Sequence, residues 1–239
     1  MLRRTSAGGS QRVGLALFDL DNTLLAGDSD HLWGDYLVGL GVVDGARYRA
    51  ENQRFYDAYR AGTLDIFEFL AFALQPLAAH PRERLEAWRE RFVAESIDPI
   101  VLPAARALVD RHRRQGHRTA IITATNRFVT EPIARLFGVD ALIATEPEEV
   151  DGVYTGRVAG VPCYREGKVT RLAEWLAGEP PTPTWFYSDS HNDLPLLGAV
   201  DHPVAVDPDP VLHEQARRRG WPVLTLRQGG LPAALTQGS

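Results

Sequence analysis

The chain has 239 residues and a formal net charge of −5, with 44% hydrophobic and 24% charged residues. This composition is that of an ordinary globular protein, and the negative charge argues against a general nucleic-acid-binding protein, whose surface would be basic. The single cysteine excludes an internal disulfide and fits a reducing cytosol, and no segment approaches the ~20 apolar residues of a membrane span. We therefore expect a cytoplasmic protein with neither nucleic-acid nor membrane partners.

The chain begins with a polar segment, residues 1–12, that contains several glycines and serines. Because this segment lacks the apolar core of a signal peptide, we expect a disordered tail. The apolar run from Val13 to Phe18 then predicts a buried β-strand, and Asp19 and Asp21 follow it directly. Two like charges close together at a strand end are unfavourable unless a cation compensates them. Taken alone, the pair is also compatible with a solvated turn.

A long helical block separates this strand from the rest of the sheet. From Asp30 to about Ile97, apolar and aromatic residues recur at helical spacing, with glycines after the first two predicted helices. A block of about 70 residues is far longer than an ordinary connection, so we interpret it as an inserted domain. The predicted organisation is a tail at 1–12, an α/β core at 13–28 and 100–239, and an all-helical cap domain at 29–99.

From Pro103 onward, predicted strands alternate with helices, which indicates a doubly wound α/β fold with a parallel sheet. The predicted strands cover 118–123, 141–145, 184–187, 204–206 and 223–226, and the predicted helices cover 103–114, a segment ending at 137, 168–177 and 210–219. A hairpin is expected at 149–157 with its turn at Asp151-Gly152, and 180–183 should form a stiff connector. Pro132 should lie in the first turn of its helix, or that helix should begin after Arg127.

Polar side chains follow three predicted strands at their carboxyl ends, where ligands of open α/β sheets bind. They are Asp19 and Asp21 after the first strand, Thr123 at the end of the second, and Asp189 and Asp193 after the strand at 184–187. Lys168 lies on the predicted helix that precedes this third strand. Carboxylates without cysteines or clustered histidines suit Mg²⁺, which takes oxygen ligands and keeps water or substrate phosphate in its shell. Thr123 and Lys168 beside such a metal are predicted to bind the oxygens of a phosphate.

This set of residues predicts Mg²⁺-dependent hydrolysis of a phosphomonoester. We assign Asp19, at the end of the rigid strand, as the nucleophile that forms an aspartyl-phosphate. Asp21 lies in the following loop and is assigned as the acid that protonates the leaving oxygen and then as the base for water. Asp189 is the best additional metal ligand, and Asp193 lies within reach of the metal or of a metal-bound water.

Four segments resemble, in order and spacing, the motifs of the haloacid dehalogenase superfamily of phosphohydrolases. They are Phe18-Asp19-Leu20-Asp21-Asn22-Thr23-Leu24, Thr123, Lys168 and Ser188-Asp189-Ser190-His191-Asn192-Asp193. The helical insert resembles the C1-type cap of subfamily IB, the phosphoserine-phosphatase-like branch, which includes histidinol-phosphate phosphatases. The resemblance implies a Rossmann-like core, the catalytic roles given above, and a metal site of Asp19, Asp21, Asp189 and Asp193, with Asp21 binding through its main-chain carbonyl. It also implies an assisting role for Asn192.

Two departures from the phosphoserine phosphatases affect the expected substrate. Asp28 holds the position of their substrate-binding glutamate, and Thr123-Ala124-Thr125 replaces their serine followed by glycines. With Asp30, Asp28 lies where the chain enters the cap, and an acidic pair there favours a small phosphorylated metabolite that bears an amino group. We expect L-histidinol phosphate first and phosphoserine second. In the structural alternative, Asp30 is a helix N-cap and Asp28 a solvated loop residue, and His31 and His191 are expected to make loop hydrogen bonds.

Two other functions remain open at this point. In a phosphotransferase or mutase, an alcohol would replace water in the second step. In a binding module, the same scaffold would carry no catalysis, but no motif residue is replaced by an inert one.

Overall fold

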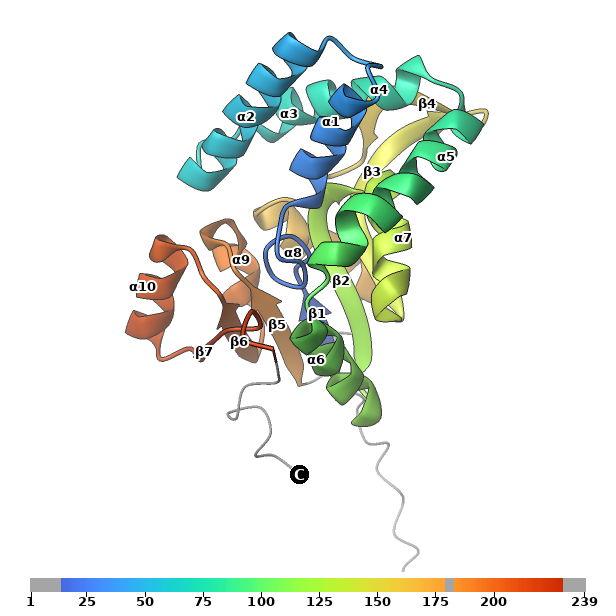
Figure 1. The fold of residues 1–239 in the computed structure, drawn as a ribbon. Coiled ribbons are helices and arrows are strands. Elements are labelled where there is room, and N and C mark those ends of the chain that lie inside the picture. The colour runs from blue at the N-terminus through green and yellow to red at the C-terminus, as the bar shows by residue number, and fades with distance from the viewer. Residues whose placement is uncertain (1–13, 179–182, 230–239) are drawn as a thin grey trace, which may run out of the picture.

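The structure, a computed structural model, describes residues 14–178 and 183–229. Its centre is a seven-stranded sheet in the order β4-β3-β2-β1-β5-β6-β7 (Figure 1). The strands are β1 (Leu15–Phe18), β2 (Arg118–Asn126), β3 (Ala141–Val150), β4 (Val153–Ala159), β5 (Thr184–Ser188), β6 (His202–Val206) and β7 (Val223–Leu224). The α-helices are α1 (Ser29–Gly39), α2 (Gly45–Ala61), α3 (Ile66–Ala73), α4 (Gln75–Ala79), α5 (Arg82–Phe92), α6 (Pro103–Arg114), α7 (Arg127–Phe137), α8 (Glu166–Leu176), α9 (Leu194–Leu197) and α10 (Pro210–Arg219).

Strand β1 lies at the centre of the sheet and pairs in parallel with β2 and β5. Its side chains alternate between two hydrophobic cores, one on each face. Leu15 and Leu17 pack with residues of α8, α9 and α10, whereas Ala16 and Phe18 pack with residues of α6 and α7. The strand pairs are parallel except for β3 with β4, where the chain turns back as a hairpin. The predicted doubly wound α/β core is therefore confirmed.

Helices α1 to α5 lie above the carboxyl ends of the central strands (Figure 1). The segments that enter and leave this helical block run side by side, because the Ala26 N–H donates to the Ile100 carbonyl at 2.8 Å and the Leu102 N–H to the Leu24 carbonyl at 3.2 Å. A paired linker of this kind suits an insertion between two strands. The exact division into a core at 13–28 and 100–239 and a cap at 29–99 stays a prediction.

The β3–β4 hairpin extends from the core sheet to the helical block. Its turn is at Asp151-Gly152, as predicted, with φ values of 50° and 79° that suit a two-residue type I′ turn. Arg82 of α5 forms an ion pair of 2.7 Å with Glu149 of the hairpin. A Cβ atom on Gly156 would lie 3.3 Å from Ala78 of α4. The hairpin therefore packs closely against the end of the helical block.

The prediction for Pro132 is wrong, because it is the sixth residue of α7 and the helix begins at Arg127. A proline in a helix interior cannot donate to the carbonyl four residues before it, which here belongs to Phe128. Arg89 of α5 donates to that carbonyl instead, at 2.8 Å from its Nη1. Arg89 thus replaces the donor that Pro132 lacks, which explains why proline is tolerated inside α7. The same hydrogen bond joins α5 to α7.

Two expectations concern segments that the structure describes only in part or not at all. The predicted tail at 1–12 and most of the predicted connector at 180–183 lie outside the described residues. Among the described residues, every helix is too short or too polar to cross a membrane.

A buried histidine joins α6 to the sheet. His112 is 4% exposed, and its Nε2 lies 2.9 Å from the Tyr187 hydroxyl while its Nδ1 lies 2.8 Å from Nδ1 of His117. Burial, together with the neighbouring His117 and Arg111, lowers the pKa of His112 to about 3. The folded protein therefore holds this imidazole neutral over a range in which an unfolded chain would protonate it.

We predict that this difference makes the fold sensitive to acid. Between about pH 6.5 and pH 3 the unfolded chain binds a proton at His112 that the folded chain does not. Protonation then favours unfolding, so this residue lowers the free energy of unfolding by up to about 1.4 kcal/mol per pH unit as the pH falls. Urea unfolding gives the free energy of unfolding at pH 7 and at pH 5. The decrease between these two pH values should be smaller for His112→Gln than for the wild type. Identical losses in the two proteins would contradict the assignment.

Candidate active site

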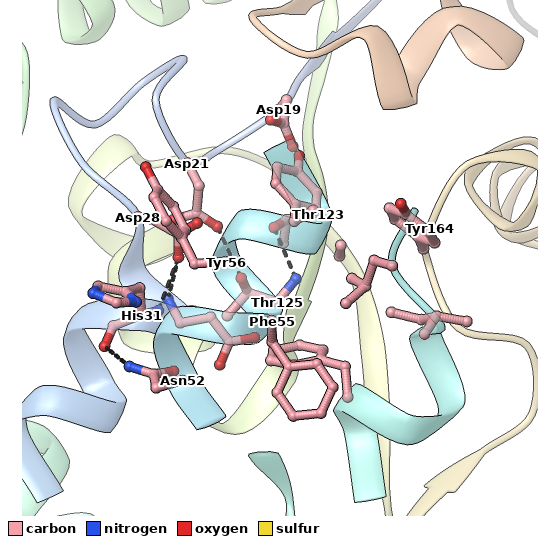
Figure 2. Close-up of a pocket in the computed structure, with 16 residues that line it drawn as sticks. Asp19, Asp21, Asp28, His31, Asn52, Phe55, Tyr56, Thr123, Thr125 and Tyr164 are labelled. Atoms are coloured by element: carbon pink, nitrogen blue, oxygen red, sulfur yellow. Dashed lines mark hydrogen bonds between the residues drawn. The ribbon is translucent and has the colours of Figure 1, made fainter. Parts of the chain in front are cut away.

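Three strands bring the candidate residues to one edge of the sheet. Phe18 of β1 pairs with Ile121 of β2 and with Tyr187 of β5, so the residues that follow each strand are neighbours. The Asp19 N–H donates to the Tyr187 carbonyl at 2.9 Å, which extends the pairing by one residue. Thr123 lies beside this point on β2, at an irregularity in its pairing with β3. Figure 2 shows Asp19 and Thr123 at the pocket that this edge forms.

Lys168 of α8 lies between two buried carboxylates. Its Nζ is 2.8 Å from Asp19 Oδ1 and 2.8 Å from Asp193 Oδ2, and Ser188 also donates to Asp193 Oδ2 at 2.7 Å. Burial alone would lower the pKa of Lys168, but the charges of Asp19 and Asp193 raise it above its ordinary value. The lysine is therefore a cation that fixes the direction of Asp19.

Asp21 is held by hydrogen bonds to both of its carboxylate oxygens. Oδ1 accepts from the Ser29 N–H at 2.6 Å, and Oδ2 accepts from the Thr125 hydroxyl at 2.8 Å. Burial, and next the charge of Asp28, raises the pKa of Asp21 to about 7. Thr125 has no assigned role in the sequence-based prediction. The signal available was its position two residues after Thr123, at the same strand end.

Asp189 is held by Thr23, the hydroxyl of the first motif. The Thr23 hydroxyl donates to Asp189 Oδ1 at 2.9 Å and accepts from the Asp189 N–H at 3.0 Å. Burial, and next the charge of Asp19, raises the pKa of Asp189 well above its ordinary value. The buried Asp19 and the half-buried Asp189 therefore lie within electrostatic reach of each other, a situation that a bound cation would relieve.

The described residues contain no group of three or more His, Cys, Asp or Glu side chains arranged to hold a metal ion. The arrangement is compatible with a site of two carboxylates, Asp19 and Asp189, completed by main-chain oxygen, water and substrate, which is how Mg²⁺ is commonly held. Asp193 already gives one oxygen to Lys168 and Ser188.

A pocket of about 570 Å³, part of it open to solvent, lies between this edge and the helical block. Its polar lining includes four carboxylates: Asp19, Asp21, Asp28 and Asp30. Aromatic side chains of the helical block form another wall, with Phe55, Tyr56 and Tyr59 from α2 and Phe69 from α3, and Tyr164 of the core also lines the pocket. Figure 2 shows Phe55 and Tyr56 among the residues around this space.

Asp28, not Asp30, is the N-cap of α1, so the predicted N-cap is wrong. Asp28 Oδ1 accepts from the main-chain N–H groups of Asp30 and His31 at 3.0 and 2.9 Å. The helix begins two residues earlier than an N-cap at Asp30 would place it, and the N–H of its first residue, Ser29, is bound to Asp21. Asp30 is freed to line the pocket, where burial and the charges of Asp28 and Asp21 raise its pKa well above the ordinary value.

Asn192, His191 and the single cysteine, Cys163, are not among the residues that line the pocket. Asn192 accepts from the Tyr164 hydroxyl at 3.0 Å and donates to the Tyr59 carbonyl at 3.0 Å, so it connects the core to α2. His191 makes the expected loop hydrogen bond, with its Nδ1 2.7 Å from Asp209. Burial raises the pKa of the Cys163 thiol to about 12, so this cysteine is not a nucleophile at neutral pH.

Comparisons with known proteins show the family to which the chain belongs. The model of the haloacid dehalogenase-like hydrolase family matches residues 16–198. A histidinol-phosphatase of Neisseria meningitidis is 48% identical over 219 residues, which cover 89% of this chain and 99% of that protein. The phosphoserine phosphatase SerB1 of Mycobacterium tuberculosis is 30% identical over 98% of this chain and 82% of that protein.

Solved structures share the fold. A crystal structure of a protein of unknown function from Bordetella pertussis is 47% identical, with a TM-score of 0.85 over 90% of this chain and 100% of that one. A phosphoserine phosphatase with bound substrate has a TM-score of 0.70 over 96% of this chain and 100% of that one, at 19% identity. The resemblance seen in the motifs is confirmed: the chain belongs to the haloacid dehalogenase-like hydrolase family and is a phosphatase of that family.

Proposed function

We propose that the protein hydrolyses a small phosphomonoester that bears an amino group, with L-histidinol phosphate as the preferred substrate, through a phosphoaspartate at Asp19 and with Mg²⁺. The negative charge of the pocket is the observation that supports this choice of substrate. Four aspartates line it, and within the described residues no lysine or arginine does. Lys168 is bound to Asp19 Oδ1 and Asp193 Oδ2 beside this pocket, so its charge is already matched by two carboxylates.

The nucleophile is Asp19, because Lys168 fixes one of its oxygens at 2.8 Å and leaves Oδ2 free of side-chain donors among the described residues. In the first step this oxygen forms a bond to phosphorus while the ester P–O bond breaks, and Asp21 gives its proton to the departing alkoxide. In the second step Asp21 takes a proton from water, whose oxygen bonds to phosphorus as the phosphoaspartate bond breaks. Thr123 and Lys168 would bind the phosphate oxygens in both steps.

The donor set fits Mg²⁺, which phosphatases of this family generally use. The residues that would hold the ion are Asp19, Asp189 and the main-chain carbonyl of Asp21, with Asp193 as a supporting residue through its second oxygen. When bound, the ion would supply positive charge to the phosphate and align it for attack. The like charges of Asp19 and Asp189 support this assignment, since the charge of Asp19 raises the pKa of Asp189 and a bound cation would relieve their repulsion.

The substrate assignment follows from charge complementarity. Burial and neighbouring carboxylates raise the pKa of Asp28 and of Asp30, and an ammonium group beside them would favour their charged forms. A carboxylate on the substrate would instead add a further like charge, which costs several kcal/mol. L-histidinol phosphate has an ammonium group and an imidazole but no carboxylate, whereas phosphoserine has a carboxylate. The aromatic wall offers rings such as Tyr56 on which a flat imidazole can pack. The name of the 48% identical relative, histidinol-phosphatase, supports the same choice.

We predict strong discrimination between the two substrates. With Mg²⁺, kcat/KM for L-histidinol phosphate should exceed that for phosphoserine by about 100-fold or more, because a penalty of a few kcal/mol corresponds to factors of that size. Asp30→Asn should lower kcat/KM for L-histidinol phosphate and reduce the discrimination. Asp57→Asn is the matched control, since it removes the same charge from an exposed position on α2. Equal rates with L-histidinol phosphate and a neutral sugar phosphate, unchanged in Asp30→Asn, would overturn the assignment.

A second prediction tests the acid–base role of Asp21 through the hydroxyl that holds it. Thr125→Val keeps the shape of the side chain and removes the hydrogen bond to Asp21, so kcat should fall about tenfold or more. Thr119→Val is the control on the same strand, because the Thr119 hydroxyl donates to Asp140 at 2.9 Å at the other end of β2. It should reduce stability and leave kcat unchanged. Equal kcat values for the two variants would contradict the role of Thr125.

A further inference from the structure

One residue of the core has a main-chain conformation that favours glycine. Arg165 has φ 51° and ψ −121°, at the second position of a tight turn in which the Gly167 N–H donates to the Tyr164 carbonyl at 2.8 Å. A side chain at such a position brings backbone strain, which persists only where other contacts hold the residue in place. The contacts of the Arg165 side chain therefore need a functional explanation.

The guanidinium of Arg165 connects the core to the cap. Its Nη2 donates to the Gly62 carbonyl, and its Nε donates to Asn192 Oδ1 at 3.1 Å. Asn192 in turn donates from Nδ2 to the Tyr59 carbonyl at 3.0 Å. Arg165 and Asn192, which we call the α2 clamp, thus bind two main-chain carbonyls at the C-terminal end of α2.

The end of α2 approaches the core too closely for a side chain. Gly62, the C-cap of α2, has φ 70°, and a Cβ atom on it would lie 2.6 Å from His191 Nε2 and 3.2 Å from Arg165 Nη2. His191 cannot easily move away, because Asp209 accepts hydrogen bonds from its main-chain N–H at 2.6 Å and holds its ring at 2.7 Å. The glycine is needed both for its conformation and for this contact.

The clamped helix also forms one wall of the substrate pocket. Asn52, Phe55, Tyr56 and Tyr59 of α2 all line it, and Figure 2 labels the first three of these side chains around the pocket. On the core side, Asn192 directly precedes Asp193, which binds Lys168. The α2 clamp therefore sets the distance between the pocket wall and the nucleophile.

We propose that Arg165 is a positioning residue that holds α2 over Asp19, so that the leaving group of the substrate is bound between cap and core. This inference rests on the proposed reaction at Asp19. An arginine suits the position because its planar guanidinium presents donors in two directions, one for Gly62 and one for Asn192, whereas a lysine ammonium offers a single centre. The strained backbone conformation of Arg165 is then tolerated because it places the guanidinium between Gly62 and Asn192.

Two variants distinguish the effect of losing the Arg165 guanidinium from the effect of relieving the backbone strain. Arg165→Ala and Arg165→Gly both remove the guanidinium, but only glycine relieves the main-chain conformation. We expect both to lose about tenfold or more in kcat/KM for L-histidinol phosphate, while Arg165→Gly unfolds at a higher temperature than Arg165→Ala. Activity toward p-nitrophenyl phosphate should fall much less, because its leaving group needs neither the cap nor an acid.

A second measurement does not depend on the substrate. Amide hydrogen exchange in residues 45–62 should be faster in both variants than in the wild type, because the C-terminal end of α2 loses its contacts with the core. Arg106→Ala is the control: it removes a similar bond, from Arg106 Nη1 to the Leu136 carbonyl at 2.9 Å, within the core. Arg106→Ala should match the wild type in the ratio of its activities toward L-histidinol phosphate and p-nitrophenyl phosphate. It should also match the wild type in the rate of amide exchange in α2.

The outcomes distinguish this inference from the proposed function. An unchanged substrate ratio or unchanged exchange at α2 in Arg165→Gly would overturn the role of Arg165. A wild-type protein without activity toward L-histidinol phosphate would instead overturn the proposed substrate, and the exchange measurement would then decide on Arg165 by itself.

Discussion

A buried lysine between two buried carboxylates is the interaction on which the site depends. Asp19, Lys168 and Asp193 are 4%, 2% and 2% exposed, so none of their charges is stabilised by bulk water. Removal of any one partner would leave an uncompensated buried charge, which is far more costly than the loss of a surface ion pair. The fold meets this requirement because β1, α8 and the loop after β5 converge at one edge of the sheet, and because both faces of β1 are packed.

The site still contains more negative charge than Lys168 can balance. On the core side Asp189 is held by Thr23 with its charge close to Asp19, which suits a metal ion. On the cap side Asp28 and Asp30 face the same pocket, which suits an ammonium group of the substrate. Asp189 and Asp28 are each within electrostatic reach of Asp19, so one arrangement can order both the phosphate and the leaving group.

The sequence predicts well those features that depend on local pattern. Parallel strands place their carboxyl ends together, so the convergence of Asp19, Thr123 and Asp189 follows from strand order alone. Glycines mark helix ends correctly, as at Gly62 and Gly138.

The features that depend on distant partners could not be predicted in this way. Pro132 is accepted inside α7 only because Arg89 of another helix supplies a donor. The N-cap is Asp28 and not Asp30 because Asp21 takes the Ser29 N–H. Thr125 contacts Asp21 across 104 positions of the chain, and the main-chain strain of Arg165 is a torsional property that residue types do not reveal.

In the proposed reaction Asp19 is phosphorylated in each turnover. Acid quenching of the enzyme during steady-state hydrolysis with Mg²⁺, followed by mass spectrometry of the peptide that contains Asp19, tests this step. We predict one added phosphoryl group on Asp19 in the wild type, and neither this group nor phosphatase activity in Asp19→Asn. A phosphoryl group on another residue, or hydrolysis by Asp19→Asn at the wild-type rate, would contradict it.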